Sequence, residues 1–201
     1  MAGDDARLPF AGLTGGIAAG KSEALKALER LGAATLSSDA VVHELLASGE
    51  VRDLLVERLG PDIAPGGQVD RAKVAEQVFG DDEQRDWLEG ILWPRVGQRI
   101  WEWRQGLEAA DDPPRAAVVE VPLLFEAGME SGFDATIAVL AEEAVREERA
   151  AARGHAGVAS RTQRQLSQDE KSQRADYTVR NDGSVEELEL ELSEVLGKIE
   201  S

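Results

Sequence analysis

The sequence predicts an α/β fold with a central parallel sheet covered by helices on both faces. Two observations lead to this prediction. Short apolar runs typical of buried strands alternate along the chain with stretches whose apolar residues recur at helical spacing. A glycine-rich loop at residues 15–22 joins the first predicted strand to the first predicted helix, a connection typical of parallel βα units.

The beginning of the chain predicts a strand, the glycine loop, a helix and a second strand. The first strand covers the apolar run at residues 8–13. Apolar positions then recur at helical spacing from Ser22, and Gly32 is a typical helix stop. A second strand at residues 33–36 leads directly toward Asp39.

Residues 39–114 are predicted to form a mainly helical insertion, because helical spacing of apolar residues replaces the strand pattern there. A long helical stretch begins near Asp82, and Pro94 within it is expected to break or kink the helix. Three tryptophans lie close together in this stretch: Trp93, Trp101 and Trp103. Aromatic residues at helical spacing are more often core than ligand-stacking groups, so we expect these to be packed inside.

The rest of the chain returns to alternating strands and helices. The predicted strands cover residues 116–121, 134–140 and 177–179, and the predicted helical segments cover residues 142–153, 160–174 and 185–199. We therefore assign residues 7–38 and 115–201 to one α/β core and residues 39–114 to the insertion.

Composition excludes several functional classes. The net charge of -17 argues against broad electrostatic binding to nucleic acid or to an anionic membrane. No apolar run approaches the roughly 20 residues that span a bilayer, and the absence of cysteine rules out disulfides and thiolate chemistry. We expect a monomeric cytoplasmic protein whose partner is a small molecule.

The glycine loop has the full spacing of a phosphate-binding P-loop: Gly15, four residues, then Gly20, Lys21 and Ser22. Glycines let consecutive backbone N–H groups converge on phosphate oxygens, and the following helix adds its positive N-terminus. Lys21 can bridge the β and γ phosphates, and the Ser22 hydroxyl can ligate Mg²⁺. The residues expected around the nucleotide phosphates are Gly16, Ile17, Ala18, Ala19, Gly20, Lys21, Ser22 and Glu23.

A glycine-rich turn could match this spacing by coincidence. Here the loop follows an apolar strand and opens an amphipathic helix, which is the context that the motif requires. The sequence therefore predicts a nucleotide-phosphate site. A P-loop alone does not separate a kinase from a nucleotide-dependent switch or motor.

Two carboxylates at predicted strand ends allow more than one interpretation. Asp39 could accept a hydroxyl proton during phosphoryl transfer, hold Mg²⁺ through water, or cap the helix that follows it. Glu120 is equally consistent with a metal-associated acid and with an outward-facing strand residue.

The segment Leu-Thr-Gly-Gly-Ile-Ala-Ala-Gly-Lys-Ser at residues 13–22 closely resembles the N-terminal signature of dephospho-CoA kinases. Further matches follow in order: Asp39, Val-Pro-Leu-Leu-Phe-Glu at residues 121–126, Ala-Asp-Tyr at residues 175–177, and Asn-Asp-Gly at residues 181–183. The resemblance runs from about residue 7 to residue 196. It implies a three-layer P-loop kinase fold with a helical acceptor-binding insertion and a helical lid at about residues 155–175.

The resemblance also implies an activity and residue roles. The family uses Mg·ATP to phosphorylate the 3′-hydroxyl of dephospho-CoA, the last step of coenzyme A synthesis. By position, Asp39 would be the general base, Arg149 would contact the transferring phosphates and Asn181 would lie near the adenine of ATP. The acceptor side would be formed by Leu123, Leu124, Glu126 and Arg164.

Several positions depart from the family pattern. Ala18-Ala19 replaces a common Gly-Ser, a change of small for small residues from which we expect little consequence. Ser37 stands where aspartate is common, and Arg180 stands at another position that is often aspartate. Trp93-Pro94 replaces a typical His-Pro pair, so any acceptor contact made by that histidine must be replaced or lost.

Basic residues and histidines also have simpler interpretations. Arg149, Arg153, Arg161 and Arg164 could be ordinary helix-pairing charges, but their clustering in an acidic chain favours a phosphate role for at least one. His43 and His155 are each far in sequence from other plausible ligands, so we expect surface or capping residues and not metal ligands.

Overall fold

The computed structural model describes residues 7–152 and 165–201. The chain divides into two compact units, and we describe each by itself. The first comprises residues 1–37 and 106–201, and the second comprises residues 38–105.

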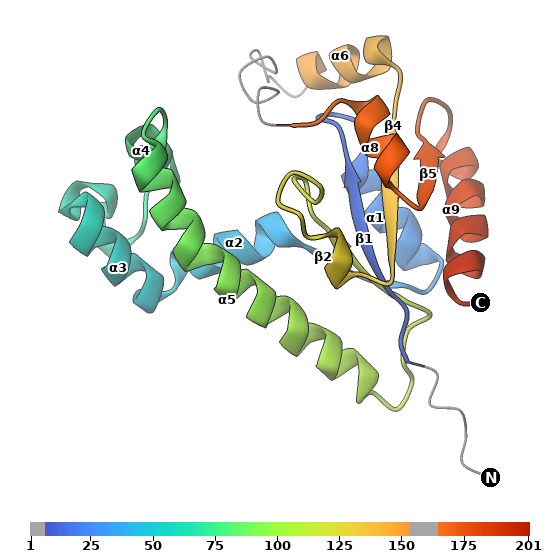
Figure 1. Cartoon of the computed structure of the whole chain (residues 1–201), viewed down its shortest axis with the longest axis horizontal. Helices are drawn as coiled ribbons and strands as arrows, with labels where there is room; N and C mark the ends of the chain where they lie inside the picture. The colour runs from blue at the N-terminus through green and yellow to red at the C-terminus, as the bar shows by residue number, and fades with distance from the viewer. Residues whose placement is uncertain (1–6, 153–164) are drawn as a thin grey trace. The chain divides into compact units, whose positions relative to one another are not determined.

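A five-stranded parallel sheet forms the centre of the first unit (Figure 1). Its strands are arranged in the order β2-β3-β1-β4-β5. They cover Phe10–Gly15 (β1), Ala34–Ser37 (β2), Ala117–Glu120 (β3), Ala135–Leu140 (β4) and Tyr177–Arg180 (β5). The predicted α/β class with a parallel sheet is confirmed.

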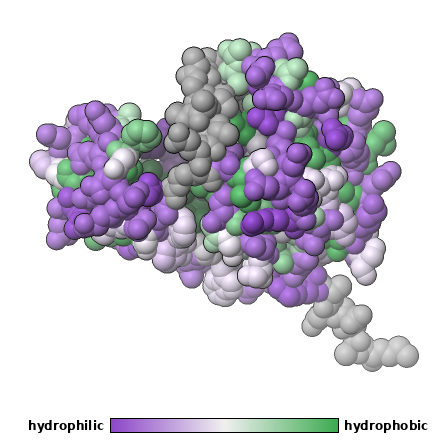
Figure 2. Space-filling model, turned by 45° about the horizontal axis from the view of Figure 1, so that its top comes forward, coloured by the Kyte–Doolittle hydropathy of each residue, from purple (hydrophilic) through white to green (hydrophobic). Residues whose placement is uncertain are grey.

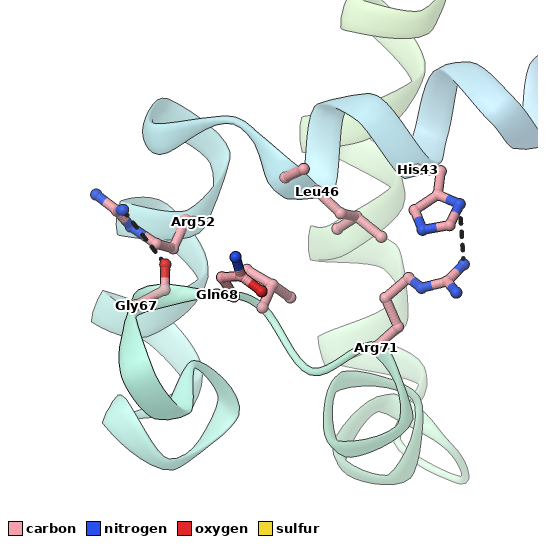
Figure 3. Close-up of a pocket in the computed structure, with 8 residues that line it drawn as sticks. His43, Leu46, Arg52, Gly67, Gln68 and Arg71 are labelled. Carbon is pink, nitrogen blue, oxygen red and sulfur yellow. Dashed lines mark hydrogen bonds between the residues drawn. The ribbon is translucent and has the colours of Figure 1, made fainter.

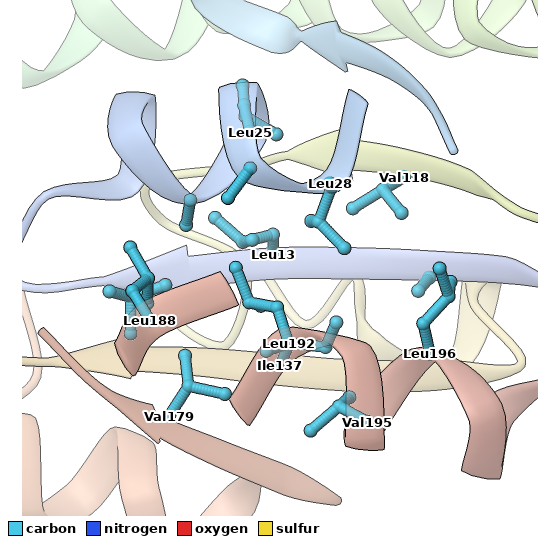
Figure 4. Packing of buried hydrophobic residues seen from close by; sticks show 14 of the residues in the cluster. Leu13, Leu25, Leu28, Val118, Ile137, Val179, Leu188, Leu192, Val195 and Leu196 are labelled. Carbon is cyan, nitrogen blue, oxygen red and sulfur yellow. The ribbon is translucent and has the colours of Figure 1, made fainter. Parts of the chain in front are cut away.

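Helices α1 (Lys21–Arg30) and α9 (Val185–Ile199) bury their apolar stripes on one face of this sheet. Figure 4 shows Leu28 of α1 and Leu192 of α9 converging on Leu13 of β1 and Ile137 of β4, and all four are buried. Burial of such side chains stabilises the fold by about 1.5–3 kcal/mol each. This core fixes the position of the start of α1 relative to the end of β1.

The opposite face of the sheet is packed closely at Gly12. A Cβ on this residue would lie 2.5 Å from Leu124 Cδ1 and 2.9 Å from Phe133 Cδ2, so a larger residue would force these two side chains to shift. Phe133 also stacks on Phe10, with ring centroids 4.7 Å apart. Two further helices of this unit are α6 (Glu143–Ala152) and α8 (Gln168–Arg174), and α8 packs against β4 and β1.

Strand order determines where a ligand can bind. β1 is central, and its neighbours β3 and β4 lie on opposite sides, so the connections diverge at its carboxyl end. Such a switch point is the usual ligand site of open parallel sheets. Residues 15–22 lie at this point.

The second unit is helical in its described residues. Its helices are α2 (Ser38–Ala47), α3 (Gly49–Leu59), α4 (Arg71–Val78) and α5 (Asp82–Glu108), with two short 3₁₀ turns at Pro61–Ile63 and Pro65–Gly67. Pro94 lies inside α5 without ending it, so of the break or kink predicted at this residue the break is wrong. Proline removes one backbone donor, but the remaining hydrogen bonds of a 27-residue helix continue on both sides.

The predicted burial of the tryptophans is wrong for two of them. Trp93 is 49% exposed and Trp101 is 57% exposed. The buried stripe of α5 instead follows a four-residue spacing through Leu92, Val96 and Ile100. Because each residue turns a helix by about 100°, the position after a stripe residue points away from the buried face.

Hydrophilic side chains predominate on the face of the molecule shown in Figure 2, in keeping with the high charge of the chain. Within the described residues, no helix combines the length and the apolar character needed to cross a membrane.

Candidate active site

The P-loop connects β1 directly to α1. The Ala19 N–H donates to the Gly16 carbonyl at 3.2 Å, which closes a tight turn, and the Glu23 N–H donates to the Gly20 carbonyl at 2.9 Å as α1 begins. The first N–H groups of a helix have no partner within it. The loop therefore presents backbone donors together with the positive end of α1, an arrangement that binds phosphate.

Two glycines of the loop are required by close packing and by backbone conformation. Gly15 has φ of 157°, and a Cβ there would lie 2.4 Å from the Val139 carbonyl oxygen. Gly20 has φ of 95°, and a Cβ there would lie 1.8 Å from Asn181 Nδ2. A larger residue at Gly15 would displace the backbone of β4, and one at Gly20 would displace the Asn181 side chain and hold a strained φ.

Ala18 has a left-handed φ of 61° and is the one described non-glycine residue with a positive φ. This conformation costs an alanine roughly 1–2 kcal/mol. Alanine and the glycine that is common in the family at this position are similar in size. They differ in backbone freedom, because glycine adopts a positive φ without this cost.

Lys21 and Ser22 occupy the first turn of α1. The Lys21 ammonium donates to the Gly15 and Gly16 carbonyl oxygens, both at 3.2 Å. The Ser22 side chain is exposed. A cation and a hydroxyl thus lie at the mouth of the loop, as the P-loop pattern predicts.

Arg149 and Asn181, which are distant in sequence, lie beside the loop. Arg149 Nη1 donates to the Asn181 carbonyl oxygen at 2.9 Å, and Asn181 Nδ2 donates to the Ala19 carbonyl oxygen at 3.0 Å. Asn181 is buried, so its side chain bridges the end of β5 to the P-loop. The structure therefore brings these two predicted residues together at the phosphate loop.

Arg146, one turn before Arg149 on α6, is a site candidate that the sequence analysis did not single out. Its Nη1 atom lies 3.5 Å from the position that a Cβ on Gly16 would occupy. Its buried Nε atom has no hydrogen-bond partner in the described structure. The three-residue spacing from Arg149, on one helix face, was the available sequence signal.

Glu120 lies at the carboxyl end of β3 and is only 8% exposed. Its Oε2 accepts a hydrogen bond from the Ser37 hydroxyl at 3.0 Å, across from the end of β2. The interpretation of Glu120 as an outward-facing strand residue is therefore wrong. Ser37 occupies the position where the family often has aspartate, and here it donates to the buried carboxylate.

The segment after β3 is anchored to α8 by Lys171. The Lys171 ammonium donates to the Pro122 carbonyl oxygen at 2.7 Å and to the Thr14 hydroxyl at 3.2 Å, and it pairs with Glu126 at 3.0 Å. Burial lowers the pKa of Lys171, and the Glu126 carboxylate partly opposes that effect.

Of the predicted acceptor-side residues, Leu123 and Glu126 are half-buried, and Leu124 is fully buried over Gly12.

Asp39 lies in the first turn of α2, two residues after the last residue of β2, and its side chain is exposed. Since α2 begins at Ser38, Asp39 is inside the helix and is not its cap. A carboxylate in the first turn still interacts favourably with the helix dipole.

Four basic residues considered in the sequence analysis lie outside the described residues: Arg153, His155, Arg161 and Arg164.

A separate cavity of about 260 Å³ lies within the second unit (Figure 3). Figure 3 shows His43 and Arg71 on one side, Arg52 and Gly67 on the other, and Leu46 and Gln68 between them; Ala47 and Val69 complete the lining. His43 is exposed, as predicted, and it lies within hydrogen-bond distance of Arg71.

Comparisons with known proteins agree with this geometry. A family model described as "Dephospho-CoA kinase" matches residues 10–187. The chain is 39% identical over 194 residues to the dephospho-CoA kinase of Deinococcus radiodurans, across 94% of this chain and 91% of the relative. The crystal structure of TT1252 from Thermus thermophilus superimposes with a TM-score of 0.80 at 32% identity, covering 96% of this chain and 98% of that one.

The parallel sheet and its phosphate loop, taken with these similarities, define a P-loop kinase. The chain belongs to the dephospho-CoA kinase family. The function of this family is the ATP-dependent phosphorylation of dephospho-CoA, the final step of coenzyme A biosynthesis.

Proposed function

We propose that this chain transfers the γ-phosphoryl group of ATP to the ribose 3′-hydroxyl of dephospho-CoA. The arrangement of Lys21, Arg149 and Asn181 around the glycine loop is the observation that supports this proposal most strongly. Phosphoryl transfer requires mainly positioning and charge stabilisation, and these residues supply both.

The donor side is formed by the first unit. Backbone N–H groups of residues 16–23 and the Lys21 ammonium would hold the β and γ phosphates, and Asn181 would contact the adenine side of the nucleotide. Arg149, with Arg146 one turn away, would offset the charge that develops on the transferring group.

Oxygen donors suited to Mg²⁺ are present at the same edge of the sheet. The Ser22 hydroxyl and the buried Glu120 carboxylate are hard ligands of the type that Mg²⁺ uses together with phosphate oxygens and water. These residues would hold the ion that accompanies ATP. When bound, Mg²⁺ neutralises charge on the β and γ phosphates.

Asp39 is proposed as the group that activates the acceptor. Its carboxylate would accept the 3′-hydroxyl proton as the ribose oxygen bonds to the γ-phosphorus and the bond to the β-phosphate oxygen breaks, releasing ADP. Leu123, Leu124, Glu126 and Arg164 would form the acceptor side of the first unit. The segment at about residues 155–175 would be a lid that excludes water.

We further propose a monomeric cytoplasmic enzyme, in keeping with the charge and composition of the chain. Two rival functions can be distinguished from this proposal by experiment. The first is a P-loop kinase for a nucleoside or shikimate-like acceptor, and the second is a nucleotide-dependent switch with no acceptor chemistry.

A coupled assay of purified protein with Mg·ATP tests the proposal. Dephospho-CoA is expected to drive ADP release with stoichiometric 3′-phosphorylation, and Lys21→Ala is expected to impair both nucleotide binding and turnover. Absence of 3′-phosphorylated product at millimolar Mg·ATP would overturn the assignment. Product formation from a different acceptor would favour the first rival, and ADP release without any phosphorylated acceptor would favour the second.

A further inference from the structure

The cavity of the second unit has a lining that is unusual for so acidic a chain. Among the described residues around it are Arg52, Arg71 and His43, and none of the eight is a carboxylate. The whole chain has 39 acidic residues against 22 basic ones. Its volume of about 260 Å³ is close to the lower end of the range for small-molecule sites.

The two arginines of the lining differ in whether a carboxylate of the described chain already pairs with them. Arg52 is committed to the Asp53 carboxylate at 2.7 Å and to the Gly67 carbonyl oxygen at 3.4 Å. Arg71, by contrast, has no carboxylate partner within the part of the chain that the structure describes, and its side chain is exposed. A guanidinium in this state retains its capacity for two-pronged hydrogen bonds to phosphate oxygens.

His43 orients Arg71 through a hydrogen bond. Arg71 Nη1 lies 3.4 Å from His43 Nδ1, and an arginine can only donate. His43 Nδ1 must therefore accept, which leaves the hydrogen of the neutral imidazole on Nε2 as a second donor near the guanidinium.

Helix α2 relates this cavity to the proposed acceptor base. Asp39 and His43 are four residues apart on α2, so they lie on the same face about one turn, or about 5.4 Å, apart along the axis. In dephospho-CoA, the 3′-hydroxyl and the 5′-diphosphate leave the same ribose ring. A ribose oriented by Asp39 would thus place its diphosphate within reach of the next turn of α2.

We infer that Arg71, oriented by His43, binds the 5′-diphosphate of the acceptor in this cavity. The inference rests on the proposed function, since it assumes that Asp39 receives the 3′-hydroxyl. The site recognises a dianionic diphosphate diester and contributes to acceptor binding without taking part in the transfer step.

The test is Arg71→Gln, with Lys73→Gln as the matched control on the first turn of the same helix. Lys73 donates to the Asp62 carbonyl oxygen and does not line the cavity. We expect Arg71→Gln to raise the KM and the Kd for dephospho-CoA about ten- to hundredfold, the loss expected for a charge-assisted hydrogen bond. The kcat at saturating acceptor and the KM for ATP should stay near wild type, and Lys73→Gln should change neither constant.

Two further variants guard against misfolding as an explanation. Arg71→Lys should recover part of the acceptor affinity, and His43→Ala should weaken it by a smaller factor than Arg71→Gln. If wild type phosphorylates dephospho-CoA and Arg71→Gln leaves its KM unchanged, this inference is wrong while the proposed function stands. If wild type does not phosphorylate dephospho-CoA at all, the proposed function fails and the inference fails with it.

Discussion

The Lys171 ammonium and the Glu126 carboxylate form a largely buried ion pair, 3.0 Å apart, between α8 and the segment after β3. The Lys171 side chain is fully buried, and its other hydrogen bonds go to Thr14 and Pro122. One ammonium group therefore joins three segments: the end of β1, which leads into the P-loop, the segment after β3, and α8. The family resemblance implies that the second lines the acceptor pocket and that the third belongs to the lid.

Breaking this pair should destabilise the protein strongly. Lys171→Met leaves the largely buried Glu126 carboxylate without its cation, although the Leu166 N–H still donates to it, and such a change costs up to about 3–5 kcal/mol. For a chain of this length the melting temperature should fall by about 10 °C, measured by thermal unfolding.

The double variant Lys171→Met, Glu126→Leu separates this effect from general loss of packing. Replacing both charges with apolar groups removes the uncompensated carboxylate, so most of the lost stability should return. A double variant that is as unstable as the sum of the two single variants would show that the two charges do not interact.

The pH dependence of stability should also report on Lys171. Its pKa in the folded protein is lowered by burial from the ordinary value of 10.5. Between the lowered value and 10.5, the unfolded chain binds more protons than the folded one, so the free energy of unfolding rises with pH. Wild type should therefore gain stability relative to Lys171→Met across this alkaline window, measured by urea denaturation. A relative loss of stability in the same window would contradict the burial effect.

Ala18→Gly should stabilise the fold. Ala18 has a left-handed φ, which glycine adopts without the steric cost, although glycine loses more backbone entropy on folding. The net gain should be about 0.5–1 kcal/mol, or a rise of about 1–4 °C in melting temperature. Ala19→Gly is the control, because buried Ala19 has no positive φ and should lose stability when its methyl group is removed. Equal effects at both positions would argue against strain at Ala18.

Arg146 and Arg149 should differ when each is replaced by methionine. Arg146→Met removes a cation beside Gly16 whose Nε has no partner, so we expect little change in stability and about a hundredfold fall in kcat/KM for ATP. Arg149→Met also removes hydrogen bonds to Asn181 and should lower both stability and activity. Wild-type activity in the Arg146 variant, measured by the coupled assay, would exclude it from the phosphate site.

Local patterns were sufficient to predict the sheet and the loop. Strand, loop and helix at the start of the chain follow from neighbouring residues, and the P-loop spacing lies within residues 15–22. By contrast, Lys171 and Glu126 are 45 residues apart, and no periodicity predicts that such a pair will meet. Arg71 and His43, 28 residues apart, are another example.

The wrong predictions have equally physical causes. Trp93 and Trp101 follow helical spacing, but they lie about 100° around α5 from its buried stripe, and apolar spacing alone does not reveal which stripe is buried. Pro94 is tolerated because a long helix keeps its other hydrogen bonds. The burial of Glu120 depends on its neighbours in the sheet, which are β1 and β2 and not adjacent segments of sequence.

Whether this chain is a kinase in which Asp39 activates the acceptor hydroxyl can be tested with the single variant Asp39→Asn. The substitution preserves size and removes the proton acceptor, so kcat for dephospho-CoA should fall about 10²- to 10⁴-fold. The Kd for ATP should stay within about twofold, since the P-loop is untouched. Turnover of ATP at the wild-type rate by Asp39→Asn would show that Asp39 is not the acceptor base and would favour a nucleotide-dependent switch.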